Sequence, residues 1–332
     1  MKTGKKAALA AIVAGAALAL AGCNSGIGTS SGGESGGEGG GEEMTIALIA
    51  KGYQHQFWQA VKQGAEQRAE ELGVTVTFDA PATETEIDKQ LSIFQDAINA
   101  KPAAIGFAAL DSKACIPLVE DATAQDIPVV YFDAPCDSDA GLSLAATDNT
   151  VAGALAAEHM AELIGGSGQV AIIGHQQTAG TGADRRDGFE EKIKADYPDV
   201  EIVDIQYGDG DQLKSADIAK ALIAAHPDLK GIYGTNEGSA IGVVNAANEL
   251  GLKAGALTII GFDSGKAQID AINNGLEAGA ITQDPIGIGE MVVQAAYDAA
   301  KGKTVEKFID TGSHWYDKSN IEDPEIAAVL YE

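Results

Sequence analysis

The chain has 332 residues, a length that suits two domains or one large α/β unit, and its 45% hydrophobic content permits a sizeable core and excludes wholesale disorder. Its formal net charge is -27, from 22 Lys and Arg residues against 49 Asp and Glu residues. Binding to a nucleic-acid backbone depends on clustered basic residues, so we expect no nucleic-acid partner. Adsorption to an anionic membrane surface by charge alone is excluded for the same reason.

The first 22 residues have the organisation of a secretory signal peptide. Three lysines precede an apolar stretch over residues 7–21, which is shorter than the roughly 20 apolar residues that a membrane-spanning helix needs. The stretch runs into Leu-Ala-Gly-Cys, which resembles a bacterial lipobox. That resemblance implies cleavage before Cys23, lipid attachment at Cys23, and a protein that is lipid-anchored on the extracytoplasmic face of the cell membrane.

Residues 23–43 then begin with this cysteine and continue almost entirely in Gly, Ser and Glu. A segment of that composition cannot bury enough apolar surface to order itself. We therefore expect a flexible tether between the lipid and the folded part of the chain.

From residue 44 onward, short β-branched runs alternate with longer amphipathic segments. This alternation predicts parallel sheets flanked by helices, and its restart near residue 149 predicts two doubly wound α/β lobes. The predicted elements, in chain order, are strand 45–50, helix 57–72 ending at Gly73, strand 74–78, helix 84–100, strands 103–107 and 127–132, helix 149–164, and strands near 170–173, 201–205, 231–233 and 257–260.

Polar and aromatic side chains follow most of the predicted strands. Ligands of doubly wound sheets bind outside the carboxyl ends of the strands, so these side chains are candidate binding residues. Charged groups hydrogen-bond strongly to hydroxyls, and aromatic rings cover the C–H face of a sugar, which indicates a neutral polyhydroxylated ligand. The candidates are Lys51, His55, Phe57, Trp58, Asp133, Arg185, Asn236, Asp263 and Gln283. His175 and Glu237 also follow predicted strands, but they are not among the candidate binding residues.

Several of these segments together resemble the ribose/galactose-type periplasmic sugar-binding proteins that serve ABC importers. The similar segments lie between about residues 45 and 310, and they are residues 45–48 with Phe57-Trp58, 127–133, the Arg-Arg-Asp-Gly-Phe run with Arg185, Asn236, 261–263 and 281–285. The resemblance implies the type 1 periplasmic-binding fold, with two lobes joined by a three-segment hinge. It also implies a monomer that captures a monosaccharide, a pentose or hexose such as ribose, fructose, xylose or galactose, and delivers it to the transmembrane subunits of an ABC permease. No enzymatic activity, cofactor or metal is implied.

The chain departs from ribose binders at four positions of this pattern. Ala134 stands where they carry Arg, and Ala108 stands where they carry Asn. Lys51 and His55 replace small polar or amide residues. These changes predict a pocket that reads a different pattern of hydroxyl groups.

The resemblance also places the lobe boundaries. Residues 44–146 plus 284–310 are expected to form the N-terminal lobe, and residues 147–283 plus 311–332 the C-terminal lobe. The chain would then cross between lobes near residues 147–149, 283–285 and 311–314.

Cys115 and Cys136 each follow a predicted strand. Neighbouring parallel strands would bring the two thiols close together, so an exported chain could join them in a disulfide, and two unpaired thiols are the alternative.

Other functions remain possible at this stage. A ligand-binding subunit for a chemoreceptor or histidine-kinase ectodomain would have the same fold and pocket. A repressor of this fold needs an N-terminal helix-turn-helix, where this chain has the predicted signal peptide and tether. An enzyme is disfavoured, since neither Gly-x-x-x-x-Gly-Lys-Ser/Thr nor Gly-x-Ser-x-Gly occurs in the sequence. His159 with Glu162 lacks the His-Glu-x-x-His pattern and is expected on a helix surface.

Overall fold

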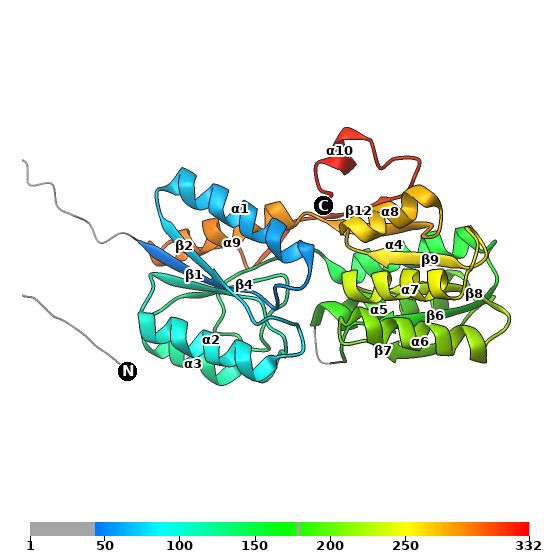
Figure 1. Cartoon of the computed structure of the whole chain (residues 1–332). Helices are drawn as coiled ribbons and strands as arrows, with labels where there is room; N and C mark the ends of the chain where they lie inside the picture. The colour runs from blue at the N-terminus through cyan, green and yellow to red at the C-terminus, as the bar shows by residue number, and fades with distance from the viewer. Residues whose placement is uncertain (1–43, 178–179, 332) are drawn as a thin grey trace, which may run out of the picture. The chain divides into compact units, whose positions relative to one another are not determined.

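The computed structural model describes residues 44–177 and 180–331. The predicted signal peptide, the lipidation site at Cys23 and the tether lie outside the described residues. The described part of the chain contains two six-stranded sheets, each covered by helices on both faces (Figure 1). The predicted fold class, two parallel-sheet α/β lobes, is confirmed.

The first lobe is built on a fully parallel sheet in the order β11-β5-β4-β3-β1-β2. Apolar runs buried from both sides form its central strands. Helices α1 and α9 pack on one face and α2 and α3 on the other. The elements are β1 (Thr45–Ile49), α1 (Gln56–Leu72), β2 (Thr75–Asp79), α2 (Ile87–Ala100), β3 (Ala104–Phe107), α3 (Ile116–Ala124), β4 (Val129–Phe132), β5 (Leu144–Ala146), α9 (Pro285–Ala300) and β11 (Phe308–Asp310).

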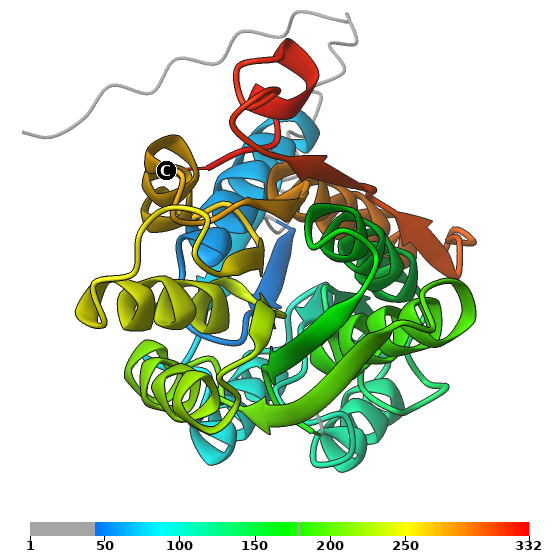
Figure 2. The same cartoon turned by 90° about the vertical axis from the view of Figure 1, so that its right-hand side faces the viewer.

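The second lobe repeats this plan with the order β12-β10-β9-β8-β6-β7. Figure 2 looks onto this lobe, with α4 and α5 on one side of the sheet and α6 and α7 on the other. The last strand, β12, runs antiparallel to β10 and was not predicted from the sequence. The elements are α4 (Asn149–Leu163), β6 (Gly168–Gly174), α5 (Gly180–Asp196), β7 (Val200–Tyr207), α6 (Gln212–Ala225), β8 (Leu229–Gly234), α7 (Glu237–Glu249), β9 (Thr258–Phe262), α8 (Lys266–Asn274), β10 (Gly279–Gln283), β12 (Ser313–Tyr316) and α10 (Pro324–Ala327).

Local sequence signals explain where several helices begin and end. The Asp148 and Asp211 carboxylates accept hydrogen bonds from backbone N–H groups in the first turns of α4 and α6. Gly73 ends α1 in a left-handed conformation with φ 65°, which glycine adopts without a steric cost. Gly64 lets α1 and α9 pack closely, because a Cβ atom there would lie 2.0 Å from the carbonyl oxygen of Ile286. Helices α1 and α9 are therefore packed backbone against backbone at this position.

The predicted start of one helix was wrong, and the difference matters for the site. The helix expected over residues 84–100 begins at Ile87, so Glu84 stays in the loop after β2. The Glu86 carboxylate accepts a hydrogen bond from the Thr83 backbone N–H at 2.8 Å and holds this loop in a turn. Glu84 is thereby free to point away from α2.

Three connections carry the chain from one sheet to the other. In the described part of the chain they follow β5, β10 and β11: residues 147–148 lead into α4, Asp284 leads into α9, and residues 311–312 lead into β12. Cys115 and Cys136 form a disulfide with their Cα atoms 6.0 Å apart, inside the cluster beneath α2 and α3. Within residues 44–177 and 180–331, no helix is long and apolar enough to cross a membrane.

The disulfide gives a stability prediction. It closes a loop with a sequence separation of 21 residues, which the chain-entropy model values at about 3 kcal/mol. We expect alkylation to label Cys115 and Cys136 only after reduction, and reduction to lower the urea midpoint of unfolding. The double variant Cys115→Ala/Cys136→Ala serves as the control, because reduction should leave its midpoint unchanged. Equal midpoints for oxidised and reduced wild type would contradict the prediction.

Candidate functional site

Twelve side chains from both lobes surround a small cavity of about 20 Å³ at the carboxyl ends of the strands. This volume is far below the usual range for small-molecule sites, because side chains of the two lobes contact one another and fill most of the space between them. All nine candidates from the sequence line it: Lys51, His55, Phe57, Trp58, Asp133, Arg185, Asn236, Asp263 and Gln283. The remaining three are Glu84, His175 and Thr181.

Lys51 and Asp133 form a buried ion pair on the first-lobe side. Lys51 directly follows the end of β1, and its Nζ lies 2.8 Å from Asp133 Oδ2. Asp133 follows β4 with φ 56°, a strained left-handed conformation that turns its carboxylate toward the cleft. Lys51 Nζ also donates to Thr181 Oγ1 of the second lobe at 3.4 Å, so the lysine spans the cleft.

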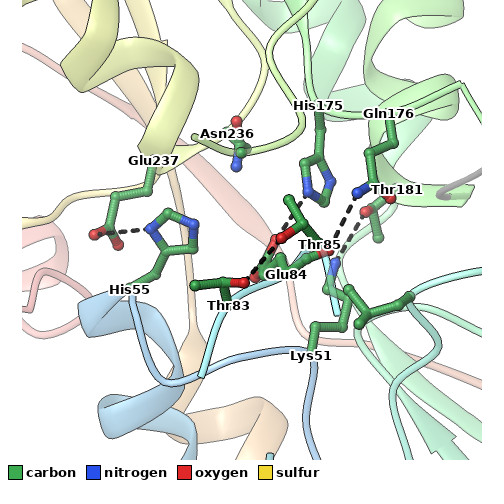
Figure 3. A network of polar contacts seen from close by, with 12 residues as sticks. Lys51, His55, Thr83, Glu84, Thr85, His175, Gln176, Thr181, Asn236 and Glu237 are labelled. Atoms are coloured by element: carbon green, nitrogen blue, oxygen red, sulfur yellow. Dashed lines mark hydrogen bonds and ion pairs between the residues drawn. The ribbon is translucent and has the colours of Figure 1, made fainter. Parts of the chain in front are cut away.

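Trp58 offers an aromatic surface in a fixed orientation. Its ring packs edge-on against Phe57, with ring centroids 4.8 Å apart, and the Lys51 ammonium lies 5.5 Å from the ring. The indole Nε1 donates to Glu84 Oε1 at 2.7 Å. Glu84 Oε2 lies 2.8 Å from His175 Nε2 of the second lobe. The tryptophan is therefore held by a carboxylate that also reaches across the cleft to His175. Figure 3 shows Glu84 and His175 facing each other.

Arg185 is the central cation of the second lobe. It lies on the buried face of α5, and its guanidinium stacks over the Phe262 ring at 3.6 Å. Its Nε donates to Asn149 Oδ1 at 2.7 Å and its Nη1 to the Thr235 carbonyl at 3.0 Å. These contacts fix the planar guanidinium group of Arg185 at the cavity wall.

Asp263 and Gln283 occupy the far wall of the cavity. Gln283 Nε2 donates to Asp263 Oδ1 at 2.6 Å, and the Glu237 backbone N–H donates to Asp263 Oδ2 at 2.9 Å. The buried Gln283 Oε1 has no hydrogen-bond partner among the described residues. Asn236 caps α7 through its Oδ1, which accepts from the Ser239 backbone N–H. An amide oxygen and a carboxylate are thus available to accept hydrogen bonds from a ligand.

Burial and neighbouring charges shift three carboxyl or imidazole groups of the site. Burial raises the pKa of Asp263, and the Arg185 charge opposes this shift only in part. Burial also disfavours the charged form of Glu84, but His175, Lys51 and His55 outweigh it and hold the pKa of Glu84 well below its usual value. Burial likewise disfavours the charged form of His55, but Glu84 and Glu237 outweigh burial and raise the pKa of His55.

The charges of the site come close to balance. Four carboxylates, those of Glu84, Asp133, Glu237 and Asp263, face the two permanent cations Lys51 and Arg185. Each carboxylate has a basic group beside it, Lys51 for Asp133, Arg185 for Asp263, and the imidazoles of His175 and His55 for Glu84 and Glu237. A site balanced in this way suits a ligand without net charge. No cluster of His, Cys, Asp or Glu in the described ranges could hold a metal ion.

Glu84 and His175 were missed as site residues for different reasons. The predicted helix over 84–100 had placed Glu84 on a helix, where it could not be aimed at the cleft. His175 did carry a signal, its position directly after the strand β6, but the resemblance assigned no ligand to it. Thr181 had no signal in the sequence, since only the fold brings α5 beside Lys51.

The fold and this cavity define a two-lobed ligand-binding protein. The model of the periplasmic binding protein domain family matches residues 46–304 of the chain. The chain belongs to this family.

Relatives with stated ligands have similar sequences. The chain is 31% identical to the D-allose-binding periplasmic protein of Escherichia coli (strain K12), over 78% of this chain and 86% of that protein. It is 30% identical to the ribose import binding protein of Bacillus subtilis (strain 168), over 81% of this chain and 85% of that protein.

Solved structures are similar over the same part of the chain. A carbohydrate transporter solute binding protein from Agrobacterium radiobacter, in complex with D-arabinose, matches with a TM-score of 0.84 and 34% identity, covering 87% of this chain and 99% of that one. An ABC transporter solute binding protein from Agrobacterium vitis with bound D-fucose matches with a TM-score of 0.83 and 36% identity, covering 86% and 100%.

The contacts of Arg185 predict how sensitive this position is. In Arg185→Lys, a single ammonium cannot reproduce the bonds to Asn149 and the Thr235 carbonyl, so we expect the free energy of unfolding to fall by about 2–4 kcal/mol. Arg186→Lys is the matched control, because its partner Asp187 is half exposed, and it should cost less than about 1 kcal/mol. Urea titration followed by circular dichroism measures both. Equal losses would refute the special role of Arg185.

Proposed function

We propose that the protein captures a monosaccharide outside the cytoplasm and delivers it, unchanged, to an ABC permease. The observation that carries this proposal is the cavity itself, which is lined by both lobes and combines charged hydrogen-bonding groups with the rings of Phe57 and Trp58. Hydroxyl groups need such donors and acceptors, and the C–H face of a sugar ring needs an aromatic cover.

The relatives support a monosaccharide ligand. The sugars named for the similar proteins are D-allose, ribose, D-arabinose and D-fucose, all of them neutral. The near balance of charge in the cavity supports a neutral ligand independently. We propose a pentose or hexose whose hydroxyl pattern differs from that of ribose, because Ala108 and Ala134, which are both buried, lack the polar side chains that ribose binders carry at the corresponding positions.

We further propose that residues 44–146 with 284–310 move as one lobe, and residues 147–283 with 311–332 as the other. The three connections between the sheets would take up the rotation as a hinge. The ligand favours the closed state because only there do both lobes contact it, and this difference in affinity is what drives closure. We propose that the protein acts as a monomer.

Anchoring is the last part of the proposal. The lipobox-like ending at Cys23 and the Gly/Ser/Glu tether support a lipoprotein on the outer face of the cell membrane. Several acyl chains on one cysteine hold a protein durably where one chain does not.

A thermal-shift panel of neutral sugars tests the function. The panel should include ribose, arabinose, xylose, fructose, galactose, allose, tagatose and fucose. A cognate sugar at 100 times its Kd is expected to add about 2.7 kcal/mol of stability. The Asp263→Asn variant should lose the shift for the same sugar, because the amide turns one of the two accepting oxygens into a donor, and both oxygens face N–H groups, of Gln283 and of Glu237. Correctly folded protein that responds to no sugar would count against the proposal, and conversion of a bound sugar would indicate an enzyme.

The lipid anchor is tested separately in a bacterial host. Wild type is expected in the membrane fraction with a lipid-modified N-terminus by mass spectrometry, because only an acylated Cys23 can hold it there. Cys23→Ser should appear in the soluble extracytoplasmic fraction. An unmodified wild-type protein in that soluble fraction would rule out the anchor.

A further inference from the structure

Two carboxylate–histidine bridges cross the cleft in opposite directions (Figure 3). In one, Glu84 of the first lobe faces His175 of the second lobe, with Oε2 and Nε2 2.8 Å apart. In the other, Glu237 of the second lobe faces His55 of the first lobe, with Oε1 and Nδ1 3.5 Å apart. Each lobe thus contributes one carboxylate and one imidazole.

The Glu84 bridge is buried, and further contacts of Glu84 surround it. Its side chain and that of His175 are 4% and 2% exposed. Besides the carboxylate contacts to Trp58 and His175, the Glu84 backbone carbonyl accepts from Gln176 Nε2 of the second lobe at 3.1 Å. The Glu84 backbone N–H donates to Gln54 Oε1 at 3.0 Å. Opening the cleft would expose all of the contacts to the second lobe at once.

The Glu237 bridge also holds the start of helix α1. His55 stands at the N-cap of α1 and makes no capping bond of its own. The Glu237 carboxylate accepts instead from the backbone N–H groups of Gln56 at 3.3 Å and Phe57 at 3.4 Å. A carboxylate of one lobe therefore caps a helix of the other, where the positive end of the helix dipole favours it.

A third contact ties the same helix end to the second lobe. Gln56 Oε1 accepts from the Lys266 backbone N–H at the start of α8, at 2.8 Å. Glu237 is 3% exposed, but among the described residues it is not one of the side chains that line the cavity. The contacts of Glu237 therefore join the two lobes in the closed cleft without requiring that Glu237 touch a ligand.

We propose that the two crossed carboxylate–histidine bridges form a proton-dependent clamp that stabilises the closed cleft and thereby sets the affinity for the ligand. The effect of the clamp on ligand affinity rests on the proposed function, whereas its effect on closure does not.

The charges around His55 and Glu84 decide the direction of the pH dependence. His55 faces Glu237 from α7, Asp263 from the turn after β9, and Glu84 from the loop after β2. Glu84 faces His175, Lys51 and His55. Asp133 pairs with Lys51, and Arg185 lies near Asp263. His55 is therefore surrounded by acidic groups, and Glu84 by basic groups.

The open cleft returns these groups to water and to their ordinary pKa values. The pKa of His55 is raised above 6.5 in the closed cleft, so its contribution to closure is complete below about pH 6.5 and is lost as the pH rises through the raised value. The pKa of Glu84 is held well below 4.5, so its contribution is complete above about pH 4.5 and is lost as the pH falls toward the lowered value. Closure is therefore strongest in mildly acidic conditions.

The test compares sugar affinity of the full-length protein at about pH 6 and about pH 9 by calorimetry, with the sugar that the panel identifies. Wild type should bind at least about fivefold more weakly at the higher pH, since coupling energies between sites commonly correspond to fivefold or more. Glu237→Gln keeps an acceptor for α1 but removes the charge, so it should bind more weakly at pH 6 and lose most of the pH dependence. Glu84→Gln should likewise weaken binding at pH 6.

Glu249→Gln is the matched control. Glu249 lies on the same helix as Glu237. It pairs with a basic residue too, Lys220, but this pair lies on the surface. This variant should keep both the wild-type affinity and its pH dependence. A Glu237→Gln protein that is folded and has the wild-type affinity at both pH values would overturn the clamp.

A second measurement separates the clamp from the proposed function. Small-angle scattering of the sugar-free proteins reports closure directly, and wild type should be more compact at about pH 6 than at about pH 9. Glu237→Gln should scatter alike at both pH values. If no sugar binds wild type but this compaction occurs, the clamp stands and the proposed function fails; if wild-type scattering does not change with pH, the clamp fails whatever the sugar result.

Discussion

The site depends on how charge is buried between two lobes. A charged group taken out of water is costly unless an opposite charge or several hydrogen bonds stand beside it. Lys51 meets this requirement through Asp133, and Glu84 through Trp58 and His175. His175 belongs to the opposite lobe, so the contact that makes the burial of Glu84 tolerable also joins the two halves of the molecule.

This arrangement links ligand recognition to closure. Glu84 orients the Trp58 ring, which lines the cavity, and at the same time contacts His175 across the cleft. Under the proposed function, a sugar that docks on Trp58 meets a wall whose geometry depends on the closed state, and each event favours the other. The close packing of α1 on α9 at Gly64 keeps the first-lobe wall rigid while this happens.

Much of the binding surface could be predicted because parallel α/β sheets concentrate function at one edge. A residue directly after a buried strand is placed by the strand itself, so Lys51, Asp133 and Asp263 could be identified from chain position and chemistry. Glu84 could not, because helical periodicity does not reveal that the first residues of a polar, Thr-rich segment stay in a turn. The predicted signal peptide and lipid anchor are sequence patterns that lie outside the described residues.

The sequence by itself determined the two-lobed α/β class, the rim of polar side chains and the close positions of Cys115 and Cys136, because each follows from local periodicity and strand order. Only the tertiary structure decided which groups pair across the cleft. Glu237 lies 181 and 180 positions along the chain from Gln56 and Phe57, whose backbone N–H groups donate to it. Strand β12 pairs antiparallel with β10 after the chain has crossed back between the sheets. Contacts of that range depend on how whole layers pack, and no local pattern records them.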